Sequence, residues 1–174
     1  MHSFDDLADR CAAFTLESLR EANDRIIEAL QTSGATSLVK TLQMIQLQKV
    51  ILAVGMFSIF EASLQDRLKC NDVFREVGAI LDQQGEHELK ERFSDLAVAI
   101  NVLKHGKGRS YDALVGKAKT LRFRVKLPDE AFFFEGDVSE VSTLVQVDDE
   151  FVRQCGAVIG RVSEILRWAH QDFF

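Results

Sequence analysis

The chain contains a single proline and only three cysteines in 174 residues. Proline ends helices and disrupts central strands, so its scarcity favours long, uninterrupted elements. The cysteines, Cys11, Cys70 and Cys155, are odd in number and far apart, and none belongs to a CxxC pair or a Cys/His cluster. This spacing favours neither a disulfide framework nor a zinc site. We therefore expect a reducing, cytoplasmic compartment, with no metal and no cofactor.

We expect no export signal, and the sequence contains no long hydrophobic run. It begins MHSFDDLADR, which is acidic where a signal peptide would be basic and then apolar. The longest apolar run, residues 50–60, would rise only about 16 Å as a helix, well short of a bilayer core. We expect no membrane partner, and a helix here that is buried on nearly all sides.

The overall composition is that of an ordinary soluble protein. Apolar residues make up 47% and charged residues 28% of the chain. A chain of this length fits one domain, residues 1–174, that buries a core of its own. Walker, GxSxG and GxGxxG motifs are all missing from the sequence, so common nucleotide-binding and hydrolase signatures give no support to those functions.

Hydrophobic periodicity predicts a mainly helical fold. Apolar residues recur at helical spacing over 3–31, 37–69, 72–83, 86–105 and 148–170, and Ser3 with Asp6 resembles a capping box. Residues 121–127 instead alternate apolar and basic side chains, which predicts a half-exposed strand. Residues 131–136 and 142–147 are expected to add further strands. The predicted fold is an up-and-down bundle of about five helices with a small β insert before the last helix.

The strand prediction also assigns faces to its side chains. Phe123 and Val125 should point toward the body of the protein, and Arg122, Arg124 and Lys126 toward solvent.

Charge is distributed unevenly along the chain. Residues 101–127 hold eight bases and one acid, which gives them a net charge of +7. Because the whole chain carries −6, the remaining residues carry −13. A segment this basic in an acidic protein can bind phosphate groups or an acidic protein surface. Alternatively, it lies against the protein's own acidic helices. The acidic remainder argues against wholesale binding of nucleic acid.

The most informative stretch is AINVLKHGKGRSYDAL, residues 99–114. Asn101 and His105 are four residues apart and share one face of a predicted helix. Gly106 suits the position that ends the helix, and the helix dipole would favour the protonated form of His105. In one interpretation these residues only complete the helix end. In the other, His105 transfers a proton while Lys107 and Arg109 hold a phosphate.

This stretch and the long helix bearing MFSIFEASLQDRL together resemble a HEPN domain, a helical family of higher eukaryotes and prokaryotes. The family's motif pairs an arginine, often followed by a polar residue, with a histidine at a helix end. Two such motifs meet in a dimer, and active members cleave RNA without a metal. Here His105 matches the histidine and Asn101 the polar residue. Apolar Val98, Ala99 and Ile100 stand where the arginine is expected.

The resemblance implies a homodimer with a composite site around His105. The candidate catalytic residues are His105 and Asn101, and the candidate phosphate- or ligand-binding residues are Lys104, Lys107, Arg109 and Ser110. Arg92 is about 20 Å from His105 along the helix and cannot replace the missing arginine within one chain.

Two functions follow from these observations. The absent arginine favours a non-catalytic, dimeric interaction or regulatory protein, in a defence or toxin–antitoxin system, with a protein partner. The alternative is a divergent, metal-independent endoribonuclease centred on His105. Binding of RNA or of a small phosphorylated ligand by the 101–127 segment is compatible with both.

Overall fold

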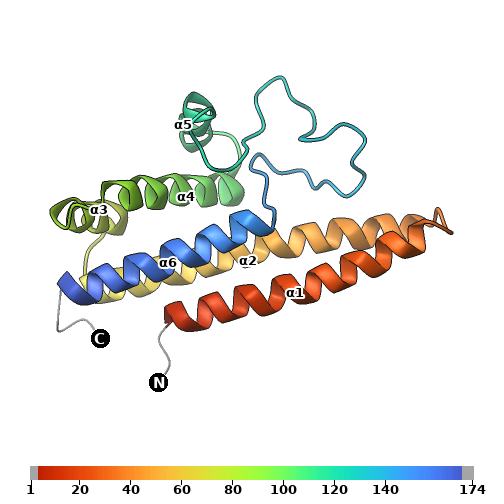
Figure 1. Ribbon diagram of the computed structural model, residues 1–174. Helices are drawn as coiled ribbons and strands as arrows, with labels where there is room; N and C mark the ends of the chain where they lie inside the picture. The colour runs from red at the N-terminus through yellow and green to blue at the C-terminus, as the bar shows by residue number, and fades with distance from the viewer. Residues whose placement is uncertain (1–3, 170–174) are drawn as a thin grey trace.

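The computed structural model describes residues 4–169 and confirms a mainly helical fold (Figure 1). Its helices are α1 (Phe4–Leu30), α2 (Thr36–Leu68), α3 (Val73–Gln83), α4 (His87–His105), α5 (Arg109–Lys117) and α6 (Asp149–Ala169). A long loop joins α5 to α6.

Three long helices form the body of the molecule. α1 and α2 make an antiparallel hairpin, α6 packs against both, and α3 and α4 cover α2 and α6 from one side (Figure 1). α1 and α6 pack through small residues: Ala8 and Ala12 are buried in α1, and Gly156 of α6 is buried next to Asp9. The α1–α2 hairpin extends beyond the start of α6 (Figure 1).

A cluster of phenylalanines joins α2, α3 and α4. Phe93 of α4 is 2% exposed, and its ring centroid lies 5.9 Å from that of Phe57, 6.4 Å from Phe60 and 5.5 Å from Phe74. Phe93 thus connects α2 with α3 at the centre of the core, where aromatic rings contribute a large buried area each.

The predicted helices agree with the observed ones to within one or two residues where both can be compared. Ser3 of the predicted capping box and His170 at the predicted end of the last helix lie outside the described residues. α5 was not predicted. It has only nine residues, begins among glycines and basic residues, and buries only Tyr111 and Leu114, so its sequence carries little apolar periodicity.

The predicted β insert is wrong. Between residues 4 and 169 the only β pairing is an isolated antiparallel bridge between Val125 and Val145. Two backbone hydrogen bonds of 2.9 Å flank this bridge. Side chains take the place of a ladder: the carboxylate of Glu140 accepts hydrogen bonds from the N–H groups of Phe133 and Phe134. Residues 118–148 therefore form an ordered loop, which we call the insert.

Side-chain alternation in 121–127 is largely confirmed even though no strand forms. Val125 is buried and Phe123 packs edge-on against Phe151 of α6, while Arg122 and Arg124 are exposed. Lys126 is the exception, because it is only 7% exposed. Its ammonium lies 2.6 Å from the Glu140 carboxylate and donates to the Ala131 carbonyl, so its charge is neutralised inside the protein.

The insert is also attached to α5. The buried hydroxyl of Tyr111 donates a 2.7 Å hydrogen bond to the backbone carbonyl of Lys126. Burial, together with the nearby carboxylates of Asp112, Asp129 and Glu130, raises the pKa of Tyr111 above its ordinary value. The neutral phenol is therefore the form that holds α5 and the insert together.

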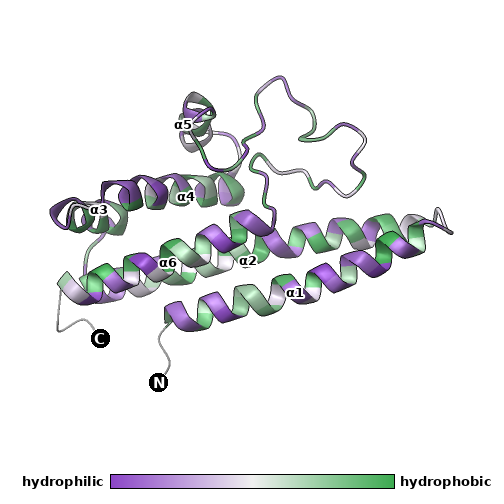
Figure 2. Ribbon diagram, viewed as in Figure 1, coloured by the Kyte–Doolittle hydropathy of each residue, from purple (hydrophilic) through white to green (hydrophobic). Residues whose placement is uncertain are grey.

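α2 is less buried than its sequence predicts. Within the 50–60 run, Ile51 and Ile59 are 62% and 57% exposed, and Leu47 and Met44 are exposed one and two turns before Ile51. Hydrophobic residues, drawn in green, occur along much of the length of α2 (Figure 2). By length and composition this 33-residue helix could cross a membrane, and only 28% of its 18-residue apolar window is buried in the protein.

Candidate functional site

The candidate site is the turn between α4 and α5. α4 ends at His105, and Gly106 follows with φ of 75° and donates its N–H to the Val102 carbonyl at 2.8 Å. This positive φ suits glycine and ends the helix as predicted. Lys104 and His105 are exposed in the last turn, and Asn101 is half-buried one turn earlier.

α5 begins immediately after this turn. Gly108 occupies the capping position and has no side chain to accept a hydrogen bond from the first turn. The first helical N–H in the backbone ladder is that of Asp112, which donates to the Gly108 carbonyl. The start of α5 therefore carries donor groups and the positive end of a helix dipole. Arg109 is exposed there and Ser110 is half-buried.

The basic segment divides into two groups of four. One group meets the protein's own acids: Lys117 pairs with Asp95, Arg122 with Glu88, Arg124 with Glu130, and Lys126 with Glu140. The alternative that the segment lies against the protein's own acidic helices thus holds for Lys117 and Arg122, whose partners are on α4, whereas Arg124 and Lys126 pair with acids of the insert. The other group is exposed and makes no ion pair within residues 4–169: Lys104, Lys107, Arg109 and Lys119.

Three of these unpaired bases, Lys104, Lys107 and Arg109, stand with His105 at the α4–α5 turn. We call these four residues the basic turn. The candidate phosphate-binding bases therefore lie within four residues of the candidate histidine, on either side of the turn. Asn101 reaches it only from one turn further back along α4, where its side chain is partly covered.

The positions where a motif arginine is expected point into the core. Ile100 is 3% exposed, Ala99 is fully buried, and Val98 is half-buried against the core cluster. Arg92 lies elsewhere, in a small cavity of about 20 Å³ with Arg122 and Phe123. Within one chain, the only arginine near His105 in the sequence is Arg109, on the far side of the turn.

A second region escaped the sequence analysis. A cavity of about 480 Å³ lies between α2, the insert and the start of α6. Its polar groups already serve the fold: Lys49 pairs with Asp149 at 2.7 Å, Asp148 accepts the N–H of Phe151 to cap α6, and Asp137 accepts from Ser139. The acidic run at 148–150 was the available signal, but Asp148 and Asp149 already have structural partners.

Metal-ligating side chains do not cluster in the described part of the chain, and one of its three cysteines is fully buried. Within residues 4–169, no three His, Cys, Asp or Glu side chains gather where they could hold a metal ion. Cys155 is fully buried, and burial raises the pKa of its thiol to about 12. Such a thiol stays protonated at neutral pH and is a poor nucleophile.

Comparisons of the chain with family models, curated proteins and solved structures found no match in any of the three. The resemblance to HEPN proteins remains a prediction from the sequence.

Proposed function

We propose that this protein is a non-catalytic, dimeric interaction or regulatory protein of the HEPN-like type, with a protein partner in a defence or toxin–antitoxin system. The observation that carries the proposal is the burial of Ile100 at the place of the motif arginine, while His105 stands exposed at the end of α4. The histidine of the motif is present, but the charge that would act with it is missing.

The chemistry of RNA cleavage explains why this matters. Without a metal, a base must take the 2′-hydroxyl proton, an acid must protonate the leaving group, and a cation must stabilise the charged phosphorus centre. Those groups have to be held in fixed positions. Between residues 4 and 169 no hydrogen bond or ion pair holds the His105 ring or the bases of the basic turn in place. This arrangement favours binding over chemistry.

The basic turn suits an acidic partner. Lys104, Lys107 and Arg109 carry uncompensated positive charge on a protein that is otherwise strongly acidic. Such a patch speeds encounter with an acidic surface and orients it. RNA and phosphorylated small molecules carry the same charge and are the other ligands that this turn could take.

The second candidate function is a divergent endoribonuclease. It is favoured by one observation, namely that Lys107 and Arg109 are unpaired beside His105 and could replace the missing arginine as the phosphate-binding cation. This assignment needs a partner copy or a substrate to order the turn.

An RNA cleavage assay separates the two functions. Purified protein is incubated with single-stranded RNA in EDTA, beside the His105→Ala and Lys119→Ala variants. Lys119 is the matched control, since it is another unpaired base outside the basic turn. We expect no cleavage by any of the three proteins. Removal of a working acid–base group would cost about 10²–10⁴ in rate, so cleavage by wild type and Lys119→Ala that is lost in His105→Ala would establish the nuclease.

The same variant reports on folding. Because His105 is exposed at a helix end, its replacement by alanine should cost no more than about 1 kcal/mol of stability. Circular dichroism and urea unfolding of the variant confirm that any loss of activity is not a loss of structure.

A further inference from the structure

One face of α2 points away from the rest of the chain and is apolar at its centre. Met44, Leu47, Ile51 and Ile59 are 55%, 47%, 62% and 57% exposed, and they follow one another at spacings of three, four and eight residues. This spacing places them on one side of the helix. In the middle of the face, Gly55 has open space around the position of a Cβ. We call this surface the outer face of α2.

We infer that the outer face of α2 pairs with the same face of a second copy, in antiparallel orientation, about a two-fold axis level with residue 53. The inference rests on the proposed dimer and specifies its contact. In this register Met44 lies beside Ala62 of the second copy and Ile51 beside Gly55, so a large side chain meets a small one in these two layers. Leu47 and Ile59 share a third layer, which is apolar on both sides. Alternating large and small residues lets two helices interdigitate.

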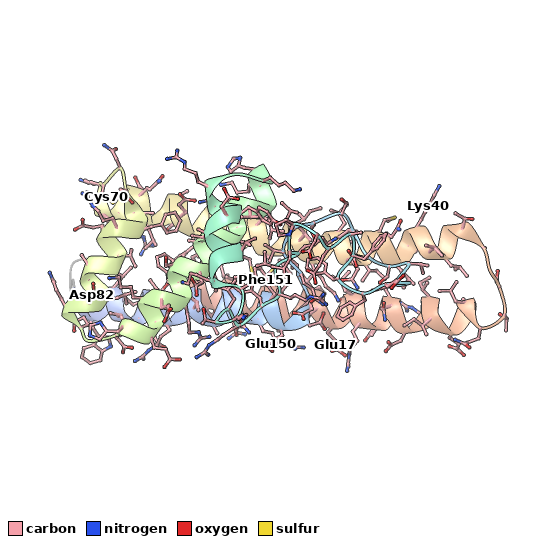
Figure 3. The ribbon with its side chains drawn as sticks, turned by 90° about the horizontal axis from the view of Figure 1, so that it is seen from above. Glu17, Lys40, Cys70, Asp82, Glu150 and Phe151 are labelled. Carbon is pink, nitrogen blue, oxygen red and sulfur yellow. The ribbon has the colours of Figure 1, made fainter. Side chains whose placement is uncertain are left out.

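The polar residues of the face obey the same register. Gln48 shares a layer with Ser58 of the second copy, with which its amide can form a hydrogen bond. Lys40 shares a layer with Asp66, so each end of the contact receives one opposite-charge pair. Both side chains are exposed, and neither makes an ion pair within residues 4–169. Figure 3 shows Lys40 pointing outward from α2, away from α1.

A parallel arrangement lacks these matches. Lys40 and Asp66 are about 39 Å apart along the helix. A parallel pair in register would therefore place lysine beside lysine and aspartate beside aspartate, which is repulsive at both ends. It would also place Ile51 beside Ile51 and leave Gly55 facing glycine. An isologous antiparallel contact is the symmetric solution that satisfies all of these positions together.

A lipid bilayer is the other occupant that an apolar helix face suggests, and it fits less well. Gln48 lies among the apolar residues on the same side of α2, and a polar group without a hydrogen-bond partner is costly in hydrocarbon. The size matching of Met44 with Ala62 and of Ile51 with Gly55 has no role against fluid lipid. It does have a role against a second helix.

Paired single-cysteine variants test the register. Met44→Cys and Ala62→Cys are made separately in a Cys11→Ser, Cys70→Ser background, with buried Cys155 retained. The two proteins are mixed, allowed to exchange subunits, and treated with an oxidant or a short bismaleimide. Because residues 44 and 62 are about 27 Å apart along α2, we expect the cross-linked dimer only in the mixture. Cross-linking of each variant alone would overturn the antiparallel register.

Substitutions on the face provide the second measurement. Ile51→Glu places two glutamates, one from each copy, at the centre of the contact and should raise the dimer Kd at least about a hundredfold. The matched control is Phe14→Glu, at an exposed apolar site of α1, which should leave the dimer Kd unchanged. Lys40→Glu should weaken the dimer severalfold, and the exchange Lys40→Glu with Asp66→Lys should restore it. An unchanged Kd for Ile51→Glu would contradict the inference.

The outcomes separate this inference from the proposed function. A dimer that neither cross-links in the mixture nor responds to Ile51→Glu would overturn the α2 contact and leave the proposed dimeric protein standing. A monomer would overturn both. Wild-type protein that is monomeric and binds phosphatidylcholine vesicles, with binding lost in Ile51→Glu, would assign the outer face to a membrane and overturn the inference.

Discussion

Glu140→Gln is expected to lower the free energy of local unfolding of the insert by about 3–5 kcal/mol. Glu140 and Lys126 expose only 10% and 9% of their side chains, and their charges lie 2.6 Å apart. The substitution keeps the shape of the side chain but leaves the Lys126 ammonium buried without a counter-charge. Hydrogen exchange of the Lys126 and Gln146 amides, which bridge the two sides of the insert, measures this loss directly.

Glu130→Gln is the matched control for this change. Glu130 lies in the same insert and pairs with Arg124 at 3.0 Å, but both side chains are about a third exposed. An exposed ion pair contributes at most about 1 kcal/mol. Equal effects of the two substitutions would show that the buried pair has no special role in the insert.

The same pair predicts a dependence on pH. Burial alone would raise the pKa of Glu140, but hydrogen bonds from Lys126 and from the N–H groups of Phe134 and Phe133 outweigh it, so the pKa lies below its ordinary 4.5. The stabilising contribution is therefore present above about pH 4.5 and is lost as the pH falls through the lower, folded-state pKa. In Glu140→Gln, protection of the insert should lose this dependence on acid.

Phe93→Ala is expected to destabilise the whole bundle by about 3–5 kcal/mol. The substitution removes the ring that three other phenylalanines surround and leaves a cavity between α2, α3 and α4. Phe14→Ala makes the same chemical change on α1, where the side chain is 77% exposed, and should stay within about 0.5 kcal/mol of wild type. Urea unfolding followed by circular dichroism compares them. Similar midpoints would mean that Phe93 is not a centre of the core.

The sequence was most informative where periodicity runs long. Each of the long helices carries enough repeating apolar residues to reveal itself, and Gly106 marked the end of α4 correctly. α5 was not predicted because a helix of nine residues with only two buried side chains shows almost no hydrophobic periodicity. Alternation in the insert identified the inward Phe123 and Val125, but alternation says nothing about whether a partner strand lies alongside. Here only Val145 does.

The site was predictable only in part for a related reason. A sequence shows how many bases a segment holds but not which acids will meet them. Lys117 and Arg122 pair with Asp95 and Glu88 on α4, and Lys126 pairs with Glu140 in the insert. Half of the bases in the segment are therefore compensated by acids of the folded protein. α2 misled in the opposite way. Its composition suggests burial, yet its outer face points away from the helices that α2 packs against and is exposed at Met44, Leu47, Ile51 and Ile59.

The molar mass in solution tests most directly the claim that this chain acts as a dimeric interaction protein. Light scattering at tens of micromolar should give twice the chain mass of 19.6 kDa for wild type and for Phe14→Glu, and a value falling toward the chain mass for Ile51→Glu. A wild-type mass of 19.6 kDa across that range would contradict the account.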